Sequence, residues 1–184
     1  MSSTESLRKD HYLIEKMLKS LNTTIELLQE GKKIPNEILY QTIDFLKNFT
    51  NICHHGKEEE TLFPSLEKNG MVRESGPIAR MLFEHELTIK LAQKIESSMI
   101  EYIQNDDSNK LIENIQNYIN HVSSHLMKEN LRLFVMADTL LSSQSHNINN
   151  ALEKIENDKL EKIGKQRKYY EGLANNMESK LKNL

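Results

Sequence analysis

Apolar residues recur every three or four positions through most of the chain, which is the periodicity of an amphipathic helix. The clearest run occupies positions 7, 11, 14, 18, 21, 25 and 28 and predicts a helix from about residue 3 to residue 29. Only three of the 184 residues are proline and six are glycine, so few positions interrupt such helices. We therefore expect an all-α protein.

The same criterion predicts three further helices. Each has an apolar stripe, and glycines or polar residues separate it from the next helix. The second spans about residues 36–68, the third begins near residue 75 and ends at a loop at residues 105–109, and the fourth spans about residues 108–141. The predicted inward faces of these helices include Ile52, Ile89 and Met136.

A fifth helical pattern follows the polar break at residues 142–145, with apolar residues from Ile148 to Met177. It has no clear set of metal-binding side chains, so we expect it either to pack on the other helices or to mediate pairing between chains. We accordingly divide the chain into a four-helix bundle, residues 1–141, and a C-terminal helical extension, residues 142–184.

Each of the four bundle helices has a histidine on its predicted inward face. On the second and fourth helices, a glutamate follows the histidine by four residues and therefore shares its face. An imidazole or carboxylate that faces a core is costly unless it is paired. The candidate metal ligands are His11, His54, Glu58, His85, His125 and Glu129.

These six side chains predict a metal centre in the middle of the bundle. Mixed imidazole and carboxylate ligands suit iron, and suit manganese or zinc less well. Six ligands are too many for one tetrahedral zinc ion, whereas two ions bridged by the two glutamates would use all of them. Gly56, in the middle of the second helix, is expected to allow a close helix contact beside this centre.

Several alternatives stay open at this stage. A metal-free structural bundle would use the same residues for packing and would bind no metal. His55 and His121 are candidate additional ligands, and His55 is alternatively a residue that orients a ligand. Glu59 and Glu60 are expected either in solvent or in contact with a ligand histidine. Cys53 is expected to be a small buried apolar residue.

Composition and charge argue against several functional classes. The formal charge of −3 gives no indication of nucleic-acid binding. No apolar run is long enough for a membrane span, and the polar N-terminus does not resemble a signal peptide. A single cysteine allows no internal disulfide, which fits a reducing compartment. We therefore expect a cytoplasmic protein with neither nucleic-acid nor membrane partners.

The stretch Cys-His-His-Gly-Lys-Glu-Glu-x2-Leu-Phe-Pro at residues 53–64 resembles the hemerythrin-like family, the HHE cation-binding domain. The resemblance extends over about residues 7–141 and includes the sequences around His85 and from His125 to Phe134. It implies an up-down four-helix bundle around a non-haem di-iron centre with an oxo or hydroxo bridge. It also implies that the four inward histidines are terminal ligands and that the two glutamates bridge the irons.

Two positions depart from the classical oxygen-carrying hemerythrins. Those proteins have a second histidine on the third helix where this chain has Ile89, and a bridging aspartate where it has Asn130. The chain resembles instead a branch with the pattern H, HxxxE, H, HxxxE. Members of that branch are linked to iron, nitric oxide or peroxide chemistry as well as to oxygen.

The resemblance and the six candidate ligands together suggest a di-iron protein that binds oxygen, peroxide or nitric oxide. If the protein is an enzyme, catalase-like degradation of peroxide is the first activity to expect. The alternative is an iron- or oxygen-sensing or iron-handling module that acts through its C-terminal helix. A homodimer formed through that helix is a further expectation.

Overall fold

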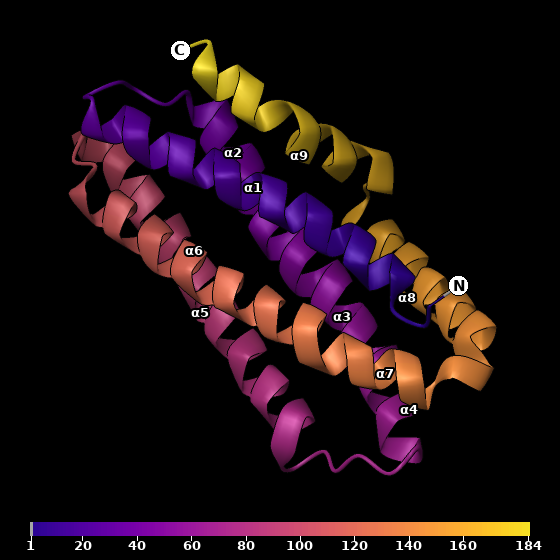
Figure 1. Cartoon of the computed structure of the whole chain (residues 1–184). Coiled ribbons are helices and arrows are strands. Elements are labelled where there is room, and N and C mark those ends of the chain that lie inside the picture. Colours follow the sequence, from indigo (N-terminus) through magenta and orange to yellow (C-terminus); the bar gives the residue numbers. More distant parts are fainter. Residues whose placement is uncertain (1) are drawn as a thin grey trace.

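The computed structural model describes residues 2–184, which form helices joined by short connections and, over this range, no β-strand. The prediction of an all-α protein is confirmed. No helix of this range is both long and apolar enough to cross a membrane. In chain order (Figure 1), the helices are α1 (Glu5–Gln29), α2 (Asn36–Asp44), η1 (Phe45–His54), α3 (His55–Lys57), η2 (Glu58–Leu62), α4 (Phe63–Lys68), α5 (Gly76–Asn105), α6 (Asn109–Lys128), η3 (Glu129–Leu133), α7 (Phe134–Leu140), η4 (Ser142–Gln144), α8 (Ser145–Ile163) and α9 (Arg167–Lys182).

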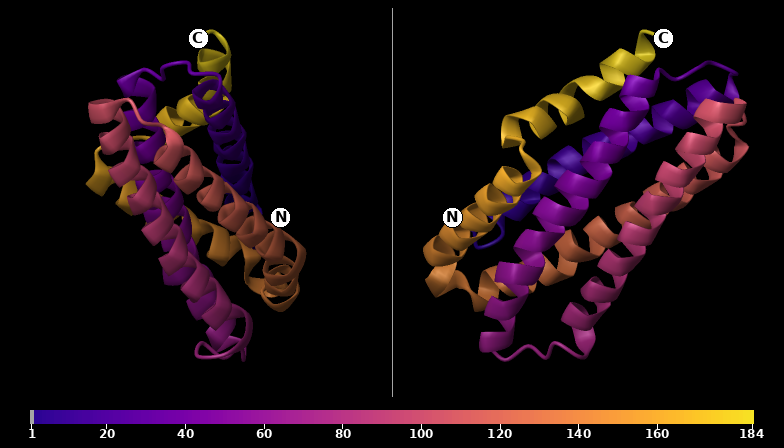
Figure 2. Two further views of the ribbon diagram at one scale, coloured as in Figure 1. Left: turned by 90° about the vertical axis from the view of Figure 1, so that its left-hand side faces the viewer. Right: turned by 180° about the vertical axis from the view of Figure 1, so that it is seen from behind.

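The first ten of these elements, α1 to α7, build a bundle of four long helices. Residues 36–68 follow one another without a break, as do residues 109–140, so each range forms one long helix with π-helical turns inside it. The helix α1 packs against α6, α6 packs against α5, and α5 packs against η1, which itself contacts α1. Figures 1 and 2 show these long helices running side by side along the molecule.

The C-terminal segment forms two helices where one pattern was predicted. Gly164 adopts a left-handed conformation (φ 73°) that ends α8, and the extended backbone at Gln166 begins α9. The helix α8 packs against η1, α3 and η2, and α9 lies along α1 (Figure 1). Apolar side chains of α9 such as Tyr170 and Met177 are buried in the bundle core. The C-terminal helices are therefore packed on the bundle.

Polar residues divide the apolar core into two clusters. One cluster contains Ile14, Cys53 and Leu91, and the other contains Leu7 and Leu62. On every long helix, buried histidines or acids lie between the residues of the two clusters. The candidate metal ligands therefore occupy a layer across the middle of the bundle.

Three predicted inward residues lie on the surface instead. Ile52 is 41% exposed, Ile89 is 42% exposed and Met136 is 40% exposed, so their prediction as core residues is wrong. Ile52 lies inside a π-helical turn and Met136 follows one, and each such turn rotates the face that points inward. On α5, the small residues Thr88 and Ala92 point into the bundle in place of Ile89.

Candidate metal centre

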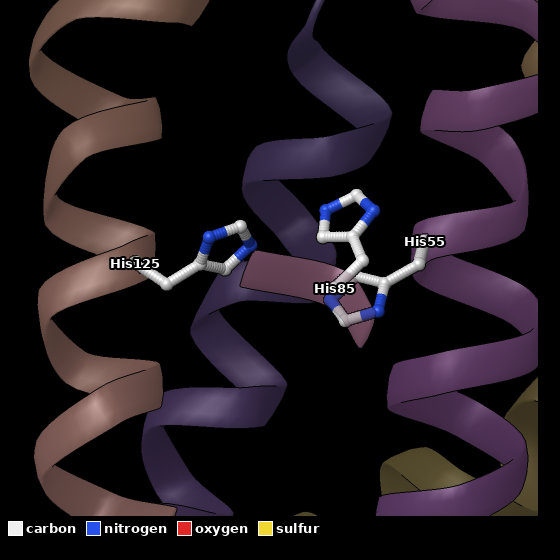
Figure 3. Close-up of side chains that lie close together, drawn as sticks. All are labelled: His55, His85 and His125. Carbon is white, nitrogen blue, oxygen red and sulfur yellow. The ribbon is translucent and has the colours of Figure 1, made fainter. Parts of the chain in front are cut away.

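All four predicted histidines and both predicted glutamates meet in this layer. Each of the six side chains is at most 2% exposed. His11 comes from α1, His85 from α5, and the two His-x3-Glu pairs come from the second and fourth long helices. Figure 3 shows His85 and His125 reaching toward one another from different helices.

The six side chains form two overlapping groups of possible metal ligands. In each group, one nitrogen or oxygen atom of every member lies within 4.8 Å of the others. Glu58 and Glu129 belong to both groups. The first group adds His11 and His54, and the second group adds His85 and His125.

The Nε2 atoms of the histidines face the two carboxylates. His11 Nε2 lies 3.2 Å from Glu129 Oε2, and His125 Nε2 lies 3.3 Å from Glu129 Oε1. His85 Nε2 lies 3.2 Å from Glu58 Oε2, and His54 Nε2 lies 3.8 Å from the same oxygen. The inward nitrogen of every ring is therefore close to a carboxylate oxygen.

The other ring nitrogen, Nδ1, has its own oxygen acceptor in each of the four histidines. Because an ionised carboxylate or an amide oxygen can only accept, this contact places the proton of a neutral ring on Nδ1, so that the lone pair of Nε2 points inward. This is the tautomer that binds a metal through Nε2. The four contacts are His11 to Asn130 Oδ1 (2.9 Å), His54 to Asp10 Oδ2 (3.3 Å), His85 to Glu59 Oε1 (2.7 Å) and His125 to Glu84 Oε2 (3.0 Å).

Of these four acceptors, only Glu59 was anticipated from the sequence. Glu59 contacts the candidate ligand His85, which is one of the two placements expected from the sequence. Glu60 instead pairs with Lys159 on α8. Asp10, Glu84 and Asn130 were missed as orienting residues. A signal was available, because Asp10 and Glu84 each directly precede an inward histidine in the sequence.

The two acids that precede a histidine are both paired with a lysine. Lys57 Nζ lies 2.6 Å from Asp10 Oδ2, and Lys128 Nζ lies 2.5 Å from Glu84 Oε1. Each lysine directly precedes one of the two central glutamates in the sequence. The centre is thus built from two similar halves, each with an acid–histidine pair on one helix and His-x2-Lys-Glu on the next.

A π-helical turn starts at each central glutamate, at Glu58 and at Glu129. Such turns widen the helix by one residue and are frequent at functional sites. Phe63 and Phe134, five residues after the glutamates, are fully buried. The ring of Phe134 stacks on His11 at 4.9 Å and that of Phe63 stacks near His85 at 5.8 Å. Two aromatic rings therefore close one side of the centre.

The two additional candidate histidines differ in their placement. The ring of His55 is 2% exposed and stacks on that of His85, with 3.8 Å between the ring centroids (Figure 3). His55, His85 and His125 also form a third close group, and His55 Nδ1 has no hydrogen-bond partner in the described residues. His121 Nε2 instead donates to the backbone oxygen of Glu84 at 3.0 Å, outside all three groups.

The charges in the centre favour a bound cation. Burial lowers the pKa of His85, but the carboxylates of Glu129, Glu58 and Glu59 outweigh this effect and raise the pKa well above its usual value. Burial raises the pKa of Glu129, but the surrounding imidazoles of His125, His11 and His85 hold it well below its usual value. Ionised carboxylates in a buried site attract either protons on the imidazoles or a metal ion.

Several central atoms are buried without a hydrogen-bond partner among residues 2–184. They are both carboxylate oxygens of Glu58 and of Glu129, together with Nε2 of His85 and of His125. Unpaired buried polar atoms are rare in proteins because they are costly. These atoms are the ones that a metal ion would contact, and their types suit iron and related ions. The residues of the centre therefore fit a bound metal.

Comparisons with known proteins agree with this geometry. The family model described as the hemerythrin HHE cation binding domain matches residues 2–137, which include all the candidate ligands. No curated protein and no solved structure matches the chain in the other two comparisons. The chain belongs to the hemerythrin HHE cation-binding domain family.

Proposed function

We propose that the chain is a non-haem iron protein whose centre holds two iron ions. The observation that carries this proposal is the pair of four-ligand groups that share Glu58 and Glu129. A carboxylate has two oxygens, so a glutamate common to both groups can bridge two ions. The unpaired oxygens of both glutamates support such a role.

We infer further that the centre acts on a small ligand, namely oxygen, peroxide or nitric oxide. Iron held there would supply one-electron redox chemistry, which the protein side chains lack. The buried rings of Phe63 and Phe134 exclude water from one side of the centre. The Nδ1 acceptors hold each histidine in one orientation, so the ligand set keeps its shape during a redox cycle. A reducing compartment such as the cytoplasm would suit this chemistry.

His55 is the additional ligand that the geometry favours. Burial lowers the pKa of His55 well below its usual value, so its ring is neutral and can offer a lone pair. The contact of His121 with the Glu84 backbone uses the nitrogen that a metal would need. We therefore expect His55→Ala to change the visible spectrum of the iron-loaded protein and His121→Ala to leave it unchanged.

The test of the proposed function is iron loading under anaerobic conditions. Elemental analysis should find two irons per chain in the wild type and about half or less in His85→Ala. The matched control is His121→Ala, which removes a histidine from the same bundle outside the ligand groups. A wild-type chain without iron, or a His85→Ala variant with full iron content, would contradict the proposal.

The visible spectrum then separates the candidate activities. After air is admitted, a charge-transfer band that disappears under argon indicates reversible oxygen binding. A spectrum that no longer responds to oxygen directs the next assays to peroxide and nitric oxide. Peroxide consumption by the wild type that is lost in His85→Ala and kept in His121→Ala would establish catalase-like activity.

A further inference from the structure

A cluster of four charged side chains, three of them buried and one, Arg167, partly exposed, joins the candidate metal centre to the C-terminal helices. Asp10 and Lys57 belong to the bundle, whereas Glu156 lies on α8 and Arg167 is the first residue of α9. Lys57 is fully buried, Asp10 is 1% exposed and Glu156 is 8% exposed. Both C-terminal members lie outside the residues that match the family model, which end at residue 137.

Every carboxylate oxygen of Asp10 has a specific partner. Oδ2 accepts from Lys57 Nζ at 2.6 Å and from His54 Nδ1 at 3.3 Å. Oδ1 accepts from Arg167 Nη1 at 2.8 Å. Asp10 therefore links Arg167 to the candidate ligand His54. Arg167 binds Oδ1 of Asp10, which is the oxygen that His54 does not contact.

Glu156 completes the cluster from α8. Its Oε2 accepts from Lys57 Nζ at 2.7 Å and from Arg167 Nη1 at 2.7 Å. The two cations are thus held between two carboxylates, and each cation contacts Asp10. This arrangement balances the charges in a buried place, where an unpaired charge would be strongly unfavourable.

The position of Arg167 on its helix also requires an explanation. A cation at the first residue of a helix faces the positive end of the helix dipole, which is unfavourable. The contacts of Arg167 with Asp10 and Glu156 offset this cost. Arg167 thus occupies an unfavourable position at the start of α9, and from this position its side chain reaches the Asp10 carboxylate.

The helix α8 also passes Gly56, two residues after His54. A Cβ atom at Gly56 would lie 3.1 Å from Cε of Lys159, so the absence of a side chain leaves room for the end of this lysine. Lys159 then pairs with Glu60. This second contact of α8 reaches neither Asp10 nor a candidate ligand.

We propose that Arg167 and Glu156 are positioning residues of the metal centre, which hold Asp10 so that it orients His54 toward the metal. The inference rests on the proposed metal site and deepens it. The docking of the C-terminal helices then sets the metal affinity of the group formed by His11, His54 and the two glutamates. The group that contains His85 and His125 is supported by Glu84 with Arg80 and Lys128, all of which belong to the bundle.

The experiment compares Arg167→Gln and Arg167→Lys with two matched controls. Glu171→Gln removes another partner of Arg167, and Lys159→Gln removes another anchor of α8. Full-length proteins are titrated with Co²⁺ under anaerobic conditions against a competing chelator, and circular dichroism checks the fold. In the zinc-loaded proteins, nitrogen-15 NMR of the histidine side chains follows the exchange of the Nδ1 protons.

We expect Arg167→Gln to weaken one of the two bound Co²⁺ ions by roughly tenfold, the lower end for residues that orient a metal ligand. Arg167→Lys should recover part of this loss, and both controls should bind Co²⁺ as the wild type does. One histidine Nδ1 proton, that of His54, should exchange faster in Arg167→Gln. If Arg167→Gln fails to fold, the proposal predicts an intermediate Co²⁺ affinity and intermediate proton exchange for Arg167→Lys.

Two results would overturn the inference. The first is a Co²⁺ affinity and an Nδ1 proton exchange rate in Arg167→Gln that equal those of the wild type. If only Arg167→Lys folds, the same result in that variant would overturn the inference. The second is an equal loss of affinity in Lys159→Gln, which would mean that the C-terminal helices only stabilise the bundle. In both cases the wild type still binds two ions, whereas a wild type that binds no Co²⁺ would contradict the proposed function itself.

Discussion

The two halves of the centre have the same kinds of polar side chain at corresponding positions, namely an acid, two histidines, a lysine and a glutamate, but different surroundings. Asp10 and Glu84 each orient the histidine of the following helix, and Lys57 and Lys128 each pair with that acid. Lys57 is fully buried under the C-terminal helices, whereas the side chain of Lys128 is 28% exposed. The difference teaches that local sequence places the candidate ligands, whereas the solvent exposure of the residues that contact them depends on which helices cover each half.

The same contrast appears one residue before each lysine. Gly56 lies under α8 in the first half, and Met127, its counterpart in the second half, is 55% exposed. A large side chain fits where no helix covers the bundle, and a glycine fits where one does. At this position the covered half therefore differs in sequence from the open half.

The largest expected effect comes from the residues that the two halves share. Glu58→Ala or Glu129→Ala should remove both metal ions, because each glutamate belongs to both ligand groups. Elemental analysis after iron loading should find little iron in either variant. Glu60→Ala, which changes an exposed glutamate next to the centre, is the control and should keep full iron content. Retention of one iron in both glutamate variants would mean that the groups are not coupled.

A smaller loss should follow when one half alone is changed. His54→Ala and His125→Ala each remove a ligand from a single group, so each should leave about one iron per chain. The same elemental analysis, with His146→Ala as a surface control, measures this difference. Loss of all iron in both single variants would show that the two halves bind metal only together.

The next largest difference is expected in the stability of the metal-free protein, when the orienting acid of each half is changed. Asp10→Asn leaves the fully buried Lys57 with Glu156 as its remaining carboxylate partner, and should lower the free energy of unfolding by about 3 kcal/mol. Glu84→Gln should cost about 1 kcal/mol or less, because its partners Arg80 and Lys128 reach water. Urea unfolding in the presence of a chelator measures both values. Equal losses would mean that the C-terminal cover does not desolvate the first half.

The smallest effect is expected at the position that differs between the halves. Gly56→Met places a long side chain against the flexible end of Lys159, and the overpacking cost of about 1–3 kcal/mol is partly offset by the roughly 1 kcal/mol that replacing a mid-helix glycine gains, so the net loss should be about 1 kcal/mol. Met127→Gly should cost about 1 kcal/mol, the usual penalty of glycine inside a helix. Thermal unfolding of both variants gives the comparison. A Gly56→Met variant that is about 1 kcal/mol more stable than the wild type would show that the added side chain has no packing cost against α8.

Much of the centre was predictable because its residues follow helix periodicity. His11, His54, His85 and His125 occupy stripe positions, and the His-x3-Glu spacing puts Glu58 and Glu129 on the same faces. The bundle itself follows from the same stripes. The prediction failed where π-helical turns change the periodicity, so that residues such as Ile52 lie on the surface.

The sequence by itself determined the helices, the four inward histidines and the two inward glutamates, since these depend on spacing within one helix. Only the tertiary structure decided that Asp10 and Glu84 contact candidate ligand histidines of other helices, and that His55 rather than His121 lies at the centre. It also decided that Arg167, more than 150 residues from Asp10 in the chain, completes the first half. These contacts join different helices, and no periodicity within one helix specifies which side chains meet across a bundle.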